Sequence, residues 1–135
     1  MINFGTQSSG SQLDLFNPDR PLVPPPGRYH VRILRHEHIP AWRGLMRRLV
    51  AEITRGPHAC ALAYKPLTDD VRGIAWLEHA LLDLCIELPK APFGQMVTAC
   101  LNALVGVEAL ATVYHYPHAE GVFVTIRTLH REDRS

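Results

Sequence analysis

The sequence has few cysteines, no long apolar run and no leader-like start. Its 3 cysteines, Cys60, Cys85 and Cys100, are widely spaced among apolar neighbours and form no CxxC pair. This pattern predicts buried free thiols in a reducing cytosol rather than a disulfide framework. Residues 1–10 lack the basic and apolar stretches of a secretory signal, and no run approaches the roughly 20 apolar residues of a membrane-spanning helix. We therefore expect a cytoplasmic protein without a membrane partner.

Patterns typical of enzymes are also scarce. A nuclease needs carboxylates that converge on a metal ion, but Asp69 and Asp70 are adjacent, so on a helix their side chains diverge by about 100°. No Gly-rich phosphate loop and no Gly-x-Ser-x-Gly elbow occurs, and the serines are nearly confined to residues 8–11. The sequence therefore predicts no catalytic residue and no cofactor.

The 8 histidines are the remaining source of metal chemistry. The segment His36-Glu37-His38 places two imidazoles on one face of a strand, and His58, or His115 with His118, would have to complete the site. The spacing fixes no third ligand, and the second histidine four residues on that a zincin helix carries is missing. We expect exposed histidines and no metal site, with a histidine-based metal-dependent enzyme kept as an alternative.

The net charge of +1 is unevenly distributed along the chain. Residues 28–65 contain eight Arg or Lys and two Glu, whereas residues 66–135 contain five Arg or Lys and nine Asp or Glu. The first half of the folded part is thus basic and the second half acidic. This asymmetry indicates either an anionic partner or two halves that complement each other within one fold.

The chain divides into an arm, one domain and a short tail. Residues 1–27 combine a Gly/Ser/Gln/Thr stretch with the run Pro24-Pro25-Pro26-Gly27, which predicts a flexible, disordered arm that ends in a stiff spacer. Residues 28–130 have the periodic apolar pattern of a single domain, and residues 131–135 are a charged tail. The sequence leaves the oligomeric state open.

The domain pattern predicts an α+β fold in which a small, mostly antiparallel sheet is covered by about three helices. Alternating apolar residues predict strands, and i, i+3, i+4 spacing predicts helices. Two segments rich in β-branched and aromatic residues flank Pro117–Gly121 and predict a C-terminal β-hairpin, and Thr68 is the expected N-cap of a helix. The expected strands are 29–33, 58–64, 110–116 and 122–129, and the expected helices are 40–53, 68–88 and 93–105.

One apolar cluster lies inside the arm, where no local core exists to receive it. The segment Gln12-Leu13-Asp14-Leu15-Phe16 matches at all five positions the Gln-Leu-Ser/Asp-Leu-Phe peptide of bacterial proteins that bind the DNA polymerase III β sliding clamp. Over these five residues the chain therefore resembles that group of clamp-binding proteins. The alternative is an arm that docks its three apolar side chains onto its own domain.

The resemblance implies a role for each residue of this peptide. Leu15 and Phe16 would fill an apolar pocket of the clamp, and Leu13 would pack on the rim of that pocket. Gln12 would fix the register through hydrogen bonds, and Asp14 would face solvent. Because ordering the arm opposes this burial, we expect an affinity in the micromolar range.

Six arginines on the first expected strand and the first expected helix point away from the apolar side. Such a basic face predicts contacts with DNA phosphates, or a solvated face that pairs with the acidic half. Few aromatic residues are interleaved with it, so the sequence does not favour stacking on single-stranded bases. The six are Arg28, Arg32, Arg43, Arg47, Arg48 and Arg55.

Together these patterns favour a non-enzymatic, nucleoid-associated accessory protein of DNA replication or repair. The arm would tether it to the sliding clamp, and the domain would contact DNA or a second protein. A mobile-element protein that occupies the clamp pocket to redirect or inhibit replication fits the same residues. The alternative class is a small nucleic-acid-binding regulator that uses the basic arginine face.

Overall fold

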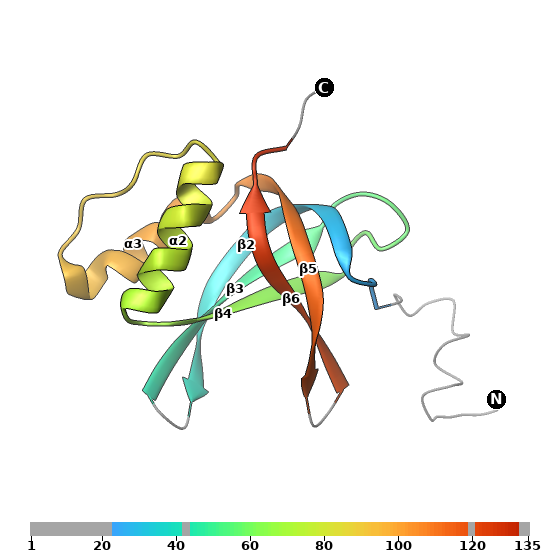
Figure 1. Ribbon diagram of the computed structural model, residues 1–135, viewed down its shortest axis with the longest axis horizontal. Helices are drawn as coiled ribbons and strands as arrows, with labels where there is room; N and C mark the ends of the chain where they lie inside the picture. The colour runs from blue at the N-terminus through green and yellow to red at the C-terminus, as the bar shows by residue number, and fades with distance from the viewer. Residues whose placement is uncertain (1–22, 42–43, 119–120, 133–135) are drawn as a thin grey trace.

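The computed structural model describes residues 23–41, 44–118 and 121–132. In these ranges the chain forms five strands and two α-helices, so the expected α+β class is confirmed. The helices lie together beside one end of the sheet (Figure 1). No helix of the described ranges is long and apolar enough to cross a membrane. In chain order the elements are β2 (Gly27–Ala41), β3 (Gly44–Ile53), β4 (Leu62–Thr68), α2 (Val71–Asp83), the 3-10 turn η1 (Phe93–Gln95), α3 (Met96–Leu104), β5 (Glu108–His118) and β6 (Gly121–His130).

The sheet closes into a barrel with the strand order β2-β3-β4-β6-β5, because β5 pairs back to β2. Each neighbouring pair is antiparallel except β4 and β6, which run parallel and share the single residue pair Tyr64–Thr125. Both α-helices lie between the third and fourth strands in sequence. This is the arrangement of the OB-fold, a five-stranded Greek-key barrel. The β2–β3 and β5–β6 pairs extend beyond the barrel in the same direction (Figure 1).

The prediction of a helix at 40–53 is wrong. Apart from residues 42 and 43, which lie outside the described ranges, this segment forms the end of β2 and the whole of β3. β3 pairs with β2 on one side and with β4 on the other, and its alternate residues Leu49, Ala51 and Ile53 are buried. The two flanking strands satisfy the backbone N–H and C=O groups of β3, and this pairing outweighs the helical spacing of its apolar residues.

The other expected elements are present, with shifted ends. β2, β5 and β6 confirm the first strand and the C-terminal hairpin, while β4 begins at Leu62, later than expected. α2 and α3 confirm two of the expected helices. Their apolar faces cover the barrel core, whose largest fully buried side chains are Ile33, Leu49, Ile53, Leu77, Leu81, Leu101, Leu104, Ile126 and Leu129.

The first turn of α2 is capped by Asp70 rather than by Thr68. The Asp70 side chain accepts hydrogen bonds from the backbone N–H groups of Arg72 and Gly73, at 3.0 and 3.4 Å. Thr68 instead donates its hydroxyl hydrogen to Asp70 Oδ1 at 2.6 Å. This hydrogen bond, together with those from the two backbone N–H groups, lowers the pKa of the Asp70 carboxyl below its ordinary value.

The far end of α2 explains why one cysteine is exposed. Cys85 has φ of 60° and follows the C-cap Leu84, and its N–H donates to the Leu82 carbonyl oxygen while the Ile86 N–H donates to that of Leu81. This is a Schellman ending with a cysteine at the left-handed position. All three cysteines are free, as expected, but only Cys100 is buried. Cys60 also has a positive φ, of 76°, in an exposed turn, so the prediction of burial is wrong for Cys60 and Cys85.

Residues 23–26 lie against the barrel. Pro24 is buried, and its carbonyl oxygen accepts a hydrogen bond from His115 Nε2 at 2.7 Å. The Tyr29 hydroxyl donates to the Pro25 carbonyl oxygen at 2.6 Å. The described part of the proline run is therefore fixed to β5 and to the start of β2.

Candidate nucleic-acid interface

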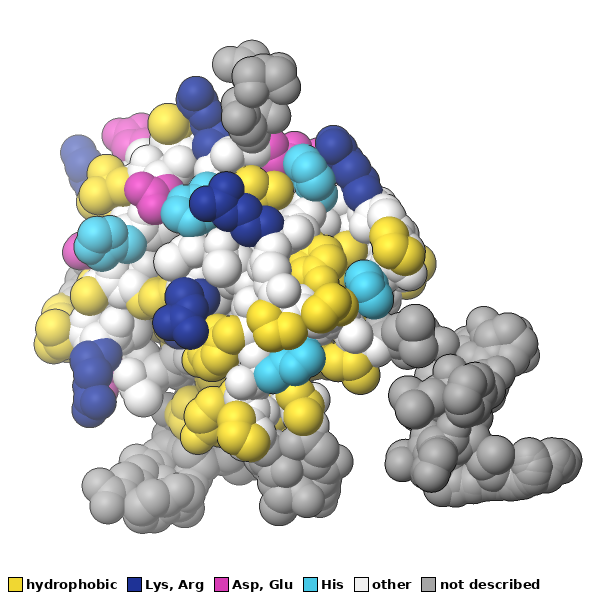
Figure 2. Space-filling view, turned by 45° about the vertical axis from the view of Figure 1, so that its right-hand side comes forward, with side chains coloured by type: hydrophobic (Ala, Val, Ile, Leu, Met, Phe, Trp, Pro, Cys, Tyr) yellow, Lys and Arg dark blue, Asp and Glu magenta, His cyan; other side chains and the backbone are white. Residues whose placement is uncertain are grey.

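A groove of about 500 Å³ crosses the barrel between the two strand pairs that extend beyond it. All five strands contribute to its walls. We call it the aromatic groove, because four of its lining residues are tyrosine or phenylalanine. It is lined by Ile39, Met46, Arg48, Tyr64, Pro66, Tyr114, Tyr116, Phe123 and Thr125. On the face shown in Figure 2, hydrophobic side chains gather in the lower half, with Lys and Arg side chains above and beside them.

The aromatic rings come from three strands that barrel closure brings together. Tyr64 lies on β4, Tyr114 and Tyr116 alternate on β5, and Phe123 lies directly opposite Tyr116 in the β5–β6 register. The Tyr64 and Phe123 rings meet edge to face, with 6.3 Å between their centroids. Tyr116 is 56 % exposed and Phe123 is 37 % exposed. Exposed ring faces of this kind are the surfaces on which unpaired bases stack.

One arginine is part of the groove wall. The Cζ atom of Arg48 lies 4.8 Å from the centroid of the Tyr64 ring. Its Nε donates to Glu37 Oε2 at 2.9 Å, and Nη2 donates to the same oxygen. Arg35 donates to the other oxygen of Glu37 at 3.1 Å. The hydrogen bonds from Arg48 and then Arg35 lower the pKa of the Glu37 carboxyl, so it stays ionised and orients the Arg48 guanidinium.

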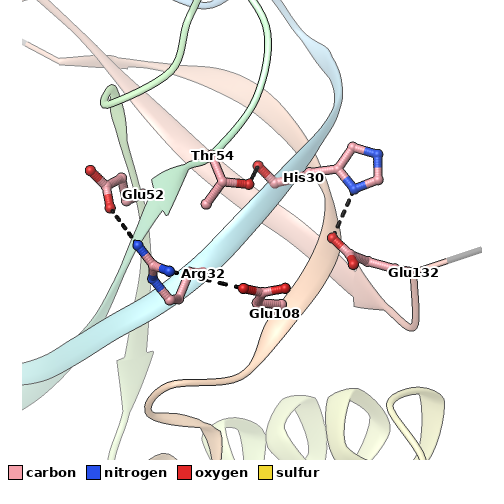
Figure 3. Close-up of polar contacts among 6 residues, drawn as sticks. All are labelled: His30, Arg32, Glu52, Thr54, Glu108 and Glu132. Carbon is pink, nitrogen blue, oxygen red and sulfur yellow. Dashed lines mark hydrogen bonds and ion pairs between the residues drawn. The ribbon is translucent and has the colours of Figure 1, made fainter.

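Three of the six predicted arginines lie away from this groove. Arg32 lies between two carboxylates, 3.6 Å from Glu52 and 3.9 Å from Glu108 (Figure 3). Arg32 and Arg55 line a separate hollow that also contains these two carboxylates. Arg48 and Glu52 are four residues apart on β3, so this hollow lies about 13 Å along the strand from the groove. Arg28 is exposed on β2, where its register partner is Thr112.

The other three arginines of the predicted basic face do not share one position. Arg48 lines the groove, as described above. Arg47 faces the opposite side of β3, where it is 14 % exposed and lies 3.9 Å from Asp69 Oδ2. Arg43 lies outside the described residues. The structure therefore does not join the six arginines into one basic face, because strand alternation separates residues that a helix would have grouped.

Two further hypotheses from the sequence concern the Gln12–Phe16 peptide and a metal site built from histidines. The peptide Gln12, Leu13, Asp14, Leu15 and Phe16 lies outside the described residues. Within the described part of the chain, no group of three His, Cys, Asp or Glu side chains is placed to hold a metal ion. His36 instead bonds to Asn102, with 2.7 Å between Nε2 and Oδ1. No protein-family model matches the sequence, and a search of curated proteins finds no significant match.

The aromatic lining is the feature that the sequence hypotheses missed. The expectation that stacking is not favoured rests on the few aromatic residues near the arginines in sequence, whereas the groove collects aromatic residues from distant segments. Tyr64 is about 50 residues from Tyr114 along the chain, and only barrel closure makes them neighbours. The available signal was the alternation of Tyr114 and Tyr116 opposite Phe123 in the expected hairpin.

Proposed function

We propose that the domain binds single-stranded nucleic acid in the aromatic groove, and that the Gln12–Phe16 peptide tethers it to the bacterial sliding clamp. The observation that carries the first part is that Tyr64, Tyr114, Tyr116 and Phe123 line one groove together with Arg48, which lies over the Tyr64 ring. Aromatic rings and a guanidinium plane offer stacking surfaces for bases. In a duplex these base faces are covered by neighbouring base pairs, so the groove favours single strands.

The fold supplies independent support for this ligand class. In OB-folds, the face of the second and third strands and the loops of the two hairpins bind oligonucleotides or oligosaccharides. Here β3 and β4 are the second and third strands of the barrel, and they contribute Met46, Arg48, Tyr64 and Pro66 to the groove. Because fold alone does not define function, the aromatic and cationic lining is what favours a nucleic acid.

The position of the arm supports the tether. The Pro24 carbonyl oxygen is hydrogen-bonded to His115, which precedes Tyr116 on β5 but does not itself line the groove. Phe16 is seven residues before Val23, so covalent geometry limits the span between them to about 25 Å. A clamp bound at Gln12–Phe16 would therefore hold its DNA close to the groove and raise the local concentration of single strand. The chain fits a replication or repair accessory protein that acts where single-stranded DNA and the clamp occur together.

The experiment that tests the groove is fluorescence anisotropy with a labelled oligothymidylate and a duplex of equal length. Stacking contributes about 1–3 kcal/mol per base, so we expect the double variant Tyr116→Ala with Phe123→Ala to bind the single strand at least about tenfold more weakly. Phe93→Ala is the matched control, because Phe93 is 68 % exposed on η1 and does not line the groove. Equal affinity for duplex and single strand, or an equal loss in the control, would overturn the proposal.

A further inference from the structure

The barrel has one weakly paired seam, between β4 and β6. These strands share only the Tyr64–Thr125 pair within the described residues. Lys65 follows Tyr64 on β4, and Arg127 is two residues beyond Thr125 on β6. α2 packs beside this seam, where Trp76 Nε1 donates to the Arg127 carbonyl oxygen at 2.9 Å. The seam therefore joins the aromatic groove to the surface of α2.

Two cations lie at the seam, and each is positioned against an aromatic ring. The Arg127 Cζ atom lies 4.5 Å from the centroid of Tyr114, a ring that also lines the aromatic groove. The Lys65 Nζ atom lies 5.0 Å from the centroid of Trp76. Rings hold cations in place without neutralising their charge. The positive charge of the groove thus continues past Tyr114 toward Trp76.

Neither cation has an acidic partner among the described residues. Arg32, Arg47 and Arg48 each lie within 4.0 Å of a carboxylate, but Lys65 and Arg127 form no such pair there. Lys65 is half-buried, and this burial lowers its pKa, as does the positive charge of Arg127 nearby. Arg127 is exposed, so only Lys65 is partly desolvated, but two neighbouring cations repel each other and gain from an anion placed between them.

One carboxylate, that of Asp83, lines the hollow beside Arg127 and contacts a histidine. Arg127, Trp76 and Asp83 line a depression between α2 and β6. Asp83 lies at the end of α2, with its Oδ2 3.6 Å from His130 Nδ1. Trp76 and Asp83 are seven residues apart on α2, which is about two helical turns, so this acid lies about 10 Å along the helix from Trp76.

We propose that Lys65 and Arg127 together bind one backbone phosphate of the strand whose bases occupy the aromatic groove, so that the strand leaves the groove over the β4–β6 seam toward Trp76. This inference rests on the proposed single-strand binding. It adds a path to the groove, with Tyr116 and Phe123 at one end and Trp76 at the other. A strand too short to span both ends would lose the phosphate contact.

The test measures binding of the full chain to oligothymidylates of about 4 to 16 nucleotides, a range that covers the site sizes of OB-folds. The variants are Lys65→Gln and Arg127→Gln, with Arg127→Lys to keep the charge and Lys90→Gln as the charge-matched control on an exposed site between α2 and α3. On the shortest oligomer that keeps full affinity, single phosphates are then replaced by neutral methylphosphonates, one linkage at a time.

We expect one linkage whose neutralisation weakens binding to the wild-type chain but not to the Lys65→Gln, Arg127→Gln double variant. The double variant should also reduce the slope of log affinity against log salt by about 0.7, the contribution of one single-strand phosphate. Arg127→Lys should keep most of this slope, and Lys90→Gln should leave it unchanged. Salt slopes and linkage profiles in the double variant that equal those of Lys90→Gln would overturn the inference.

The two proposals fail in different ways. If Tyr116 and Phe123 are required but Lys65 and Arg127 are not, the groove binds single strands and the seam does not hold a phosphate. If no oligomer binds at any length, the groove proposal fails, and the phosphate site fails with it. Circular dichroism of each variant separates these results from a loss of folding.

Discussion

The guanidinium of Arg48 lies over the Tyr64 ring at 4.8 Å while it donates hydrogen bonds to Glu37. The ring lies on β4 and the carboxylate on β2, so Arg48 links three adjacent strands through one planar group. Glu37 fixes the direction of the guanidinium, and Tyr64 fixes its plane. The groove wall is therefore set before any ligand arrives, which lowers the cost of ordering on binding.

Arg48→Lys should weaken binding of an oligothymidylate by about two- to fivefold, the loss expected from about 0.5–1 kcal/mol of cation–π and stacking contact. Lysine keeps the charge but lacks the planar fork that contacts both Glu37 and Tyr64. Arg35→Lys is the matched control, because Arg35 also bonds to Glu37 and does not line the groove. Fluorescence anisotropy titrations measure the affinity of both variants for the oligothymidylate. An equal loss of affinity in the two variants would show that the guanidinium plane of Arg48 does not contribute to binding.

Leu15→Ala with Phe16→Ala should reduce binding of the full chain to purified sliding clamp by about 100-fold or more. Each apolar side chain buried in the clamp pocket is worth roughly 1.5–3 kcal/mol. Binding to single-stranded oligomers should not change, because the aromatic groove lies in the domain. Asn17→Ala serves as the control next to the peptide. Surface plasmon resonance measures the affinity for the clamp. Clamp binding that is unchanged by the double substitution would overturn the proposed tether.

Gly73→Ala should destabilise the domain by about 1–3 kcal/mol, although alanine normally favours a helix. A Cβ atom at Gly73 would lie 1.9 Å from the Thr68 carbonyl oxygen, a backbone atom at the end of β4. Either the end of β4 or the start of α2 would have to shift. Ala75→Gly, on an exposed position of the same helix, should cost only about 0.5–1 kcal/mol. Urea unfolding followed by circular dichroism compares the two, and a stabilised Gly73→Ala would contradict the close contact.

Cys85→Gly should stabilise the domain by about 0.5–1 kcal/mol, since glycine adopts the left-handed conformation without the steric cost of a Cβ atom. The side chain of Cys85 accepts only a weak contact from Arg131 Nη1, at 3.5 Å. Cys85→Ala separates the two effects, because it removes the thiol and keeps the Cβ atom. Thermal unfolding measures the stability of both variants. An equal gain in stability for Cys85→Ala and Cys85→Gly would mean that the backbone conformation is not the cause.

The stability of the domain should fall with acidification below about pH 4, partly through Asp70. Its folded-state pKa lies below the ordinary value of 3.8, with the Thr68 hydrogen bond as the largest cause. A lowered pKa means that the stabilisation is complete above the unfolded-state value and is lost as the pH falls through the folded-state value. Asp70→Asn should keep a capping oxygen and flatten this acid limb.

The control for this pH profile is Glu87→Gln, on an exposed position beyond α2. Thermal unfolding midpoints measured from neutral pH to about pH 2 give the profiles, which span the ordinary carboxyl range. The Asp70→Asn profile should be less steep than that of the wild type and of Glu87→Gln. Identical profiles for all three chains would show that Asp70 does not contribute to the acid dependence.

The local signals in the sequence identified several elements. The spacing of Leu77 and Leu81 predicted α2, and the two apolar segments around Pro117 predicted the β5–β6 hairpin. The same spacing of apolar residues predicted a helix at Leu45–Ile53, and this prediction is wrong. The segment is a barrel strand paired on both sides, and its outward-facing positions are not all polar. Val50 is fully buried beside Leu49 and Ala51, so the apolar run fits both periods.

The sequence by itself determined the α+β class, two helices, the C-terminal hairpin and the peptide that resembles clamp-binding motifs, because each depends on residues close together in the chain. Tertiary structure alone decided that Tyr64, Tyr114 and Phe123 share one groove, that Arg32 pairs with acids, and that Lys65 and Arg127 meet at a seam. These contacts join distant segments through strand pairing and barrel closure. Side-chain periodicity records which face of an element is buried, but it does not record which other element covers that face.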